Sequence, residues 1–328
     1  MIPLPHMKGR ACRVVGLGPA GLAACAALSE AGAEVTVWDD DADKRSATEL
    51  AAKGPRASLS GLHAVILCDG GIAAAAKTII PRAKDAGVEV LTDLDLFADA
   101  MAALDDRPQT IGITGLRGTG AAEIVAHILS HEGAKVAGGG GASLPCLAMH
   151  APHPEQTYVV ELPIARLAAA KRFRADVSVV QSLGNKADST GLDAVLRAAM
   201  RLFRAHAHGD AAVIAVDDAV GQKLCTALQS GAVGKLAAGE VIPVSGRASL
   251  GHGVYILGAQ AYSARGGRTQ SLGDLARAPA FADGARMDDA VAAIAACVAL
   301  GVAPPQIIKA LHSFGMAPCA ASKRASHG

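Results

Sequence analysis

Short apolar runs of strand length alternate with helix-length stretches along most of this chain. Strand-like runs occur at residues 13–15, 33–38, 64–68, 88–93, 157–161 and 176–180, while residues 191–206 repeat apolar side chains at helical spacing. Strands that alternate with helices predict βαβ units and a mainly parallel sheet. Near the C-terminus, residues 251–275 predict a β-hairpin, and residues 285–314 predict two helices interrupted at Pro304 and Pro305.

The first glycine-rich turn follows the strand at residues 13–15 and precedes a helix at residues 22–32. The next strand ends in two acids, and a second glycine turn follows the strand at residues 64–68. This is the order of a dinucleotide-type Rossmann unit, in which backbone N–H groups approach a diphosphate and an acid hydrogen-bonds a ribose or base. The alternative is a tight structural turn with solvated acids at a strand end. The candidate nucleotide-binding residues are Gly16, Gly18, Pro19, Ala20, Gly21, Asp39, Asp40 and Gly71.

A third glycine-rich turn lies within residues 112–129, between an apolar strand and a helix. This is the layout of a phosphate-binding loop, where backbone N–H groups and a helix N-terminus face an anion. Such loops close with Gly-Lys-Ser/Thr, whose lysine and hydroxyl serve the phosphates and magnesium. Here the loop is degenerate, and binding of ATP with magnesium is expected to be weak or absent. Its residues are Thr114, Gly115, Arg117, Gly118, Thr119 and Gly120.

Composition narrows the class of protein. The 328 residues are 51% hydrophobic and 19% charged, which suits two globular domains with ample cores. A net charge of +1 and an aromatic content of 3% argue against nucleic-acid binding. The seven cysteines form no CxxC pair and are expected to be reduced thiols. The chain shows no signal peptide, and residues 290–303 are too short to span a bilayer, so a cytoplasmic protein is expected.

Several motifs stand in the order found in one family of enzymes. They are GLGPAGLAACAALSEAGAEVTVWDD, CDGGI, TDLDLF, IGITG, GDAAVIAVDD and ALGVAPPQIIKALHSF. In this order the chain resembles the Mur ligases of peptidoglycan precursor synthesis, and within them the MurD type. The resemblance implies an α/β fold with a Rossmann-like uridine-nucleotide domain (1–107), a P-loop-type central domain (108–278) and a helical entry (279–328) to a C-terminal domain that does not fit in the remaining residues.

The resemblance also implies that ATP phosphorylates a carboxylate, with a lysine and two magnesium ions neutralising the transferred phosphoryl group. Thr119 and Gly120 stand at the positions of the phosphate lysine and the magnesium-binding hydroxyl. Glu161 matches a magnesium-binding acid but is interpreted as a relic, because the polar residues expected beside it are replaced. The other substituted positions are Pro163 and Ile164 for a Ser-Ser pair, Ala187 for the metal-binding histidine, and Ala199 for the carbamylated lysine.

The main hypothesis is therefore a catalytically degenerate MurD-like protein without a metal site. It would retain the binding of UDP or a UDP-sugar, or a regulatory role with an unidentified protein partner. One alternative is an active ligase completed by another chain. A weaker alternative is an NAD(P)-dependent oxidoreductase that uses the turn from Gly16 to Gly21. Outside these motifs, His206 and His208 precede Gly209 in a turn and are predicted to be surface residues.

Overall fold

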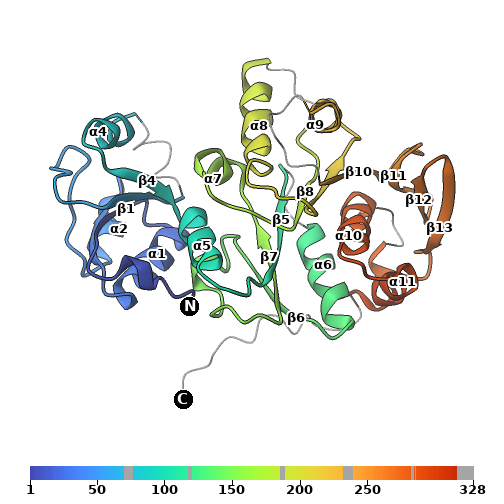
Figure 1. Ribbon diagram of the computed structural model, residues 1–328, viewed down its shortest axis with the longest axis horizontal. Coiled ribbons are helices and arrows are strands. Elements are labelled where there is room, and N and C mark those ends of the chain that lie inside the picture. The colour runs from blue at the N-terminus through green and yellow to red at the C-terminus, as the bar shows by residue number, and fades with distance from the viewer. Residues whose placement is uncertain are drawn as a thin grey trace. The chain divides into compact units, whose positions relative to one another are not determined.

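The computed structural model describes residues 1–69, 77–116, 120–184, 189–231, 239–281, 284 and 286–315 (Figure 1). The chain folds into two compact units, each formed by more than one stretch of sequence. Unit 1 comprises Met1–Pro108, Gly139–Pro154 and Pro163–Phe173, and unit 2 comprises Gln109–Gly138, Glu155–Leu162 and Arg174–Gly328. The α/β class predicted from the alternating pattern is confirmed in both units.

Unit 1 is built on a parallel sheet with the strand order β2-β1-β3-β4. Its strands are β1 (Ala11–Val15), β2 (Glu34–Trp38), β3 (Ala64–Leu67) and β4 (Glu89–Thr92). Its helices are α1 (Pro19–Glu30), α2 (Ala42–Ser46), α4 (Ile79–Asp85), α5 (Asp93–Ala102) and α7 (Ile164–Ala169), with short 3₁₀ turns at Pro5–Met7 and Cys146–Ala148. Because the strands are parallel, the turns after β1, β2 and β3 lie at one edge of the sheet.

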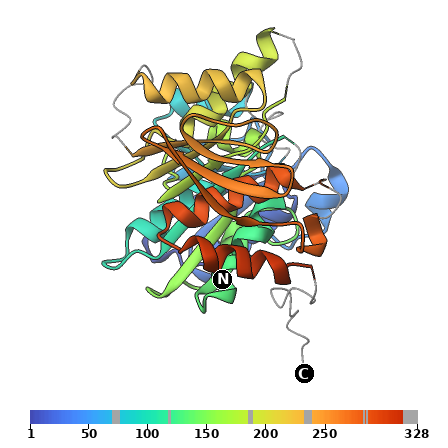
Figure 2. The same ribbon diagram turned by 90° about the vertical axis from the view of Figure 1, so that its right-hand side faces the viewer.

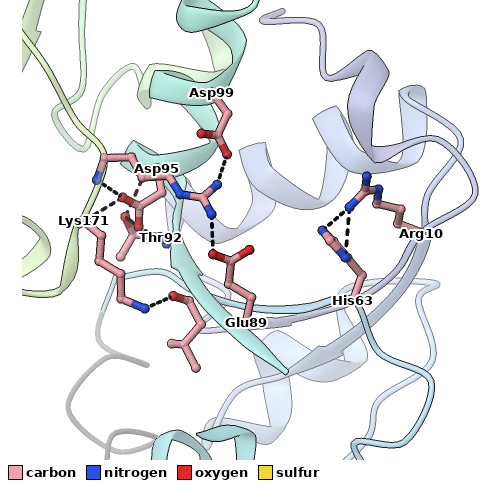
Figure 3. Close-up of polar contacts among 9 residues, drawn as sticks. Arg10, His63, Glu89, Thr92, Asp95, Asp99 and Lys171 are labelled. Atoms are coloured by element: carbon pink, nitrogen blue, oxygen red, sulfur yellow. Dashed lines mark hydrogen bonds and ion pairs between the residues drawn. The ribbon is translucent and has the colours of Figure 1, made fainter. Parts of the chain in front are cut away.

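The segment Pro163–Phe173 belongs to unit 1 because its polar groups bind α5 and β4 (Figure 3). The Asp95 carboxylate accepts hydrogen bonds from the N–H groups of Lys171 and Arg172, at 2.6 and 2.8 Å. The Arg172 guanidinium forms ion pairs with Glu89 and Asp99. Asp95 also closes a capping box at the start of α5. One carboxylate therefore stabilises the helix N-terminus and also holds a segment that follows it by more than seventy residues.

Unit 2 contains a nine-stranded sheet with the order β13-β12-β11-β10-β9-β8-β5-β7-β6. The strands are β5 (Gln109–Thr114), β6 (Lys135–Gly139), β7 (Gln156–Glu161), β8 (Val177–Val180), β9 (Ala211–Ala215), β10 (Glu240–Ser245), β11 (Gly253–Leu257), β12 (Gln260–Arg265) and β13 (Arg268–Asp274). Strands β7, β5, β8, β9, β10 and β11 are paired in parallel, and β11, β12 and β13 are antiparallel. The hairpin predicted over residues 251–275 is confirmed.

The helices described in unit 2 are α6 (Gly120–His131), α8 (Ser189–Arg201), α9 (Ala219–Gln229), α10 (Met287–Ala299) and α11 (Pro304–Ser313), with a 3₁₀ turn at Pro279–Phe281. The last two are the helices that the sequence predicts near the C-terminus. The alanine-rich α10 packs against α6 and the central strands, and α11 packs against β13 (Figure 2). The small side chains of α10 are buried from Ala290 to Cys297. Among the described residues, no helix combines the length and the apolar character needed to cross a bilayer.

Candidate functional site

The glycine turn of unit 1 is required by the close approach of α1 to the end of β1. Gly16 has a φ of +94°, and its N–H donates to the Trp38 carbonyl at 2.8 Å. A Cβ on Gly21 would lie 1.8 Å from the Gly16 carbonyl oxygen, so no other residue fits there without a shift of the backbone. The glycine spacing in the sequence thus reflects both a left-handed residue and a backbone contact.

An internal carboxylate occupies the N-terminus of α1. The Asp69 Oδ2 atom accepts hydrogen bonds from the N–H groups of Ala20 (2.9 Å) and Gly21 (3.2 Å). The same oxygen would lie 2.6 Å from a Cβ on Gly18, the N-cap residue, while Pro19 is the first residue of the helix. The glycine pattern predicted that these N–H groups face a diphosphate, and it did not identify Asp69. The acid inside the second glycine turn, CDGG, was the sequence feature that could have indicated this role.

The two acids after β2 have different surroundings. Asp39 accepts hydrogen bonds from the N–H groups of Leu17 (2.7 Å) and Asp41 (2.9 Å), so its carboxylate is held against the glycine turn. Burial raises the pKa of Asp39, but those two hydrogen bonds, Lys44 and Arg45 together outweigh it and lower the pKa. Asp40 is exposed and accepts a hydrogen bond from Trp38 Nε1 at 3.1 Å.

Other members of the candidate site fall outside the described residues. They are Gly71 of unit 1 and Arg117, Gly118 and Thr119 of the glycine-rich loop in unit 2. The loop residues on either side are described. Thr114 ends β5 and is buried, and its hydroxyl donates to the Leu162 carbonyl at 2.6 Å. Gly115 follows β5, and Gly120 is the first residue of α6.

A second internal carboxylate stands at the N-terminus of α6. A Cβ on Gly120 would lie 2.1 Å from Asp289 Oδ2, so this carboxylate packs directly on the glycine. Gln181 Nε2 donates to Asp289 Oδ1 at 2.6 Å, and Arg286 Nε lies 3.6 Å from Asp289 Oδ2. Arg286 also donates to the Gly120 carbonyl at 3.3 Å. The ion pair of Asp289 and Arg286 thus lies at the helix end that would face a nucleotide phosphate.

The neighbouring acid of α10 makes a similar contact. A Cβ on Gly246, which follows β10, would lie 2.4 Å from Asp288 Oδ1. Arg247 Nη2 forms an ion pair with Asp288 Oδ2 at 2.9 Å. The first turn of α10 therefore places two carboxylates against two glycines at the carboxyl edge of the unit 2 sheet. Edges of this kind hold the ligands of open α/β sheets.

Asp217 and Asp218, which follow β9, connect strand ends at this edge. Asp217 accepts hydrogen bonds from the Ser245 hydroxyl (2.5 Å) and the Gly246 N–H (2.9 Å). Asp218 caps α9 through the Gly221 N–H and also accepts from the Leu183 N–H at 2.8 Å. The sequence marked these acids only as part of a family motif. Their hydrogen bonds assign them a positioning role.

The described residues do not fit a site for the magnesium ions that the resemblance implies. Glu161 ends β7 as predicted, but Pro163 and Ile164 offer no side-chain oxygen beside it. Ala199 is fully buried in α8, and Ala187 lies outside the described residues. Across the described ranges, no group of three or more His, Cys, Asp or Glu side chains is placed to hold a metal ion. Magnesium is usually held by one or two protein carboxylates together with substrate phosphates, and here the hydroxyl and the histidine that the resemblance implies beside Glu161 are replaced by Gly120 and Ala187.

The prediction that His206 is a surface residue is wrong. Its side chain is buried, with Nε2 2.6 Å from the Ser178 hydroxyl and the ring edge-on to Phe203. His206 lines a cavity of about 450 Å³ with Phe203, Leu228, Glu240 and His252. This cavity lies at the amino ends of β9 and β10, not at the carboxyl edge that carries the glycine loop.

Known proteins resemble part or nearly all of this chain. A family model described as "Putative NAD(P)-binding" matches residues 5–94. The UDP-N-acetylmuramoylalanine–D-glutamate ligase of Phenylobacterium zucineum is 32% identical over 327 residues, which cover 96% of this chain and 68% of that protein. The ligase of the same name from Rhizobium meliloti is 30% identical over 322 residues, with the same two coverages.

Solved structures share the fold at lower identity. The UDP-N-acetylmuramate:L-alanyl-gamma-D-glutamyl-meso-diaminopimelate ligase of Neisseria meningitides has a TM-score of 0.56 at 15% identity, covering 93% of this chain and 98% of that one. The UDP-N-acetylmuramate–alanine ligase of Thermotoga maritima has a TM-score of 0.51 at 17% identity, covering 93% of this chain and 68% of that one. These likenesses show the fold, and the identity to curated ligases across 96% of the chain shows the relationship. This chain belongs to the Mur ligase family.

Proposed function

We propose that this Mur ligase homologue recognises a uridine nucleotide or UDP-sugar of peptidoglycan precursor synthesis in unit 1 and does not catalyse ATP-dependent ligation. The observation that carries the proposal is the contact between Asp289 and Gly120. In a working phosphate-binding loop, the helix N-terminus and a lysine bring positive charge to the nucleotide. Here the Asp289 carboxylate packs on the first residue of α6 and takes up Arg286, the nearest cation that the structure describes there.

The chemistry of acyl-phosphate formation gives a second reason. Phosphoryl transfer depends almost entirely on positioning and on neutralising the charge of the transferred group. In this chain, Thr119 and Gly120 stand where the resemblance implies a lysine and a hydroxyl, and Ala199 carries no amine. The metal-binding histidine that the resemblance implies is replaced by Ala187. These substitutions act together, so a single replacement would not restore turnover.

Recognition of uridine is supported by the parts of unit 1 that need only the backbone and one acid. Asp39 is held beside the glycine turn by the Leu17 N–H, with both oxygens still able to accept a further hydrogen bond. The lowered pKa of Asp39 keeps it ionised at neutral pH. A binding protein of this kind would act as a regulator or as a partner of another protein that handles the same precursors.

The proposal is tested by turnover. Purified chain is incubated with ATP, magnesium, UDP-N-acetylmuramoyl-L-alanine and D-glutamate, and ADP release is followed by a coupled assay. The Phenylobacterium zucineum relative serves as the positive control and heat-inactivated protein as the blank. We expect no ADP above the blank. ADP that depends on D-glutamate would overturn the proposal. A thermal-shift titration in parallel is expected to show a larger stabilisation by UDP than by ATP.

A second candidate is an active ligase completed by another chain, which the names of the curated relatives favour. Turnover that begins only after a second protein is added would support it. The family model matching residues 5–94 favours a third candidate, a nicotinamide-dependent enzyme. Stabilisation by NAD without stabilisation by UDP would support that one.

A further inference from the structure

Asp69 is held in an unusual backbone conformation next to the glycine turn of unit 1. Among the described residues, it is the only non-glycine residue with a positive φ, at +46°. Aspartate tolerates this left-handed region better than most residues, although glycine and asparagine suit it best. The conformation goes with the two hydrogen bonds that bring Oδ2 to the N–H groups of Ala20 and Gly21.

The position of this carboxylate matches the needs of α1. The helix is 12 residues long, and Gly18 at its N-cap has no side chain to accept a hydrogen bond from the first turn. Asp69 supplies that acceptor from a position 49 residues further along the chain. A carboxylate oxygen and a phosphate oxygen bind a helix N-terminus through the same N–H groups and the same dipole. Both cannot occupy the N–H groups of Ala20 and Gly21 together.

The space above the turn is filled as well. Asp69 Oδ2 would lie 2.6 Å and Cγ 2.9 Å from a Cβ on Gly18. A group in the place of a Gly18 side chain would therefore collide with this carboxylate. A diphosphate would meet a like charge at close range, whereas an uncharged ribose or base beside Asp39 would not.

We propose that Asp69 is a specificity-determining residue of unit 1, which occupies the place of a nucleotide's phosphate groups, so that UDP binds no more tightly than uridine. This inference rests on the proposed uridine recognition and names the part of the ligand that the site recognises. Loss of the carboxylate frees two N–H groups and a helix N-terminus for a diphosphate. Affinity for UDP then rises, while affinity for uridine stays almost unchanged.

The test is calorimetric titration of the full chain with uridine and with UDP. The variants are Asp69→Gly and Asp69→Asn, because both residues suit a positive φ. Asp85→Asn is the matched control, since Asp85 is an exposed residue at the end of α4 and the change removes the same charge. Circular dichroism and a melting curve establish that each variant is folded. Asp69→Asn keeps the shape of the side chain if Asp69→Gly fails to fold.

We expect the unmodified chain and Asp85→Asn to bind uridine and UDP within threefold of one another. Asp69→Gly should bind UDP at least tenfold more tightly, with uridine affinity changed less than threefold, and Asp69→Asn should fall between them. Equal UDP affinity with and without Asp69, while uridine still binds, would overturn this inference and leave the proposed function standing. Failure of every variant to bind either ligand would overturn both.

Discussion

Asp93 and Arg166 form an ion pair in the interior of unit 1, with Oδ2 and Nη1 2.5 Å apart, although 73 positions separate them in the sequence. Their side chains are 1% and 6% exposed, so water screens neither charge. Asp93 Oδ1 has no hydrogen-bond partner among the described residues. Burial raises the pKa of Asp93 by more than Arg166 lowers it. Cys146 Sγ also donates to Oδ2 at 3.4 Å, and the guanidinium is the larger of the two effects that stabilise the ionised carboxylate.

Removal of Arg166 should be strongly destabilising. In Arg166→Met the Asp93 carboxylate stays buried without its counter-ion, and we expect a loss of about 3–5 kcal/mol in the free energy of unfolding, measured in urea. Arg172→Met is the control, because its partners Glu89 and Asp99 are partly exposed, and it should lose about 1 kcal/mol or less. Equal losses in the two variants would show that the buried ion pair contributes no more to the free energy of unfolding than the partly exposed one.

Residues 1–108 alone should not form a stable domain. That fragment lacks the segments 139–154 and 163–173, which belong to unit 1. Asp93 would lose Arg166, and Asp95 would lose the N–H groups of Lys171 and Arg172. We expect the fragment to unfold without a cooperative transition, followed by circular dichroism during heating. A sharp transition close to that of the full chain would show that the returning segments are dispensable.

Gly21 should tolerate no side chain. The Cβ of Gly21→Ala would meet the Gly16 carbonyl oxygen at 1.8 Å, so either α1 or the turn must move. We expect a loss of about 3 kcal/mol or more in the free energy of unfolding. Gly54→Ala is the control in the same unit, because its Cβ would meet only Trp38, at 3.7 Å. A loss below about 1 kcal/mol in Gly21→Ala would show that the backbone yields more easily than core packing normally permits.

Stability should fall as the solution becomes acidic, in part because of His206. Burial lowers the pKa of His206, against an opposing effect of Asp210, so the folded chain resists protonation. The unfolded chain binds a proton below about pH 6.5, and stability is lost as pH falls below that value. His6 and His63 also have lowered pKa values, mainly through burial. In His206→Gln, the difference in unfolding free energy between pH 7.5 and pH 5.5 should shrink. If this difference in unfolding free energy is unchanged in the variant, His206 does not contribute to the loss of stability in acid.

The elements of both sheets could be predicted because their signals are local. The apolar run into Gly16 and the acid after β2 indicated a Rossmann-like unit, and the hairpin and the last two helices followed from alternation and from Pro304. The contacts that characterise the site are not local. Asp69 reaches Gly21 only because β1 and β3 are adjacent strands. Asp289 reaches Gly120 only because α10 packs on α6.

No local pattern in the sequence indicated that residues 163–173 belong to unit 1. The run of alanines and basic residues after Pro163 reads as an ordinary helix and loop. Its role depends on Asp93 and Asp95, which the sequence shows only as acids at the start of a helix. Apolar periodicity specifies which face of an element is buried, but it does not specify which distant charge will meet which acid. Burial of His206 was missed for the same reason, because its partner Ser178 lies on another strand.

Calorimetric titration with ATP and magnesium tests the proposal that this Mur ligase homologue does not use ATP. The measurement compares this chain with the Phenylobacterium zucineum relative under identical conditions. Loss of a charge-assisted contact alone removes about 1.5–3 kcal/mol, so binding should be at least tenfold weaker than in the relative. The packing of the Asp289 carboxylate on Gly120 should weaken it further. Binding of ATP as tight as that of the relative would show that the loop of unit 2 is still a working ATP site.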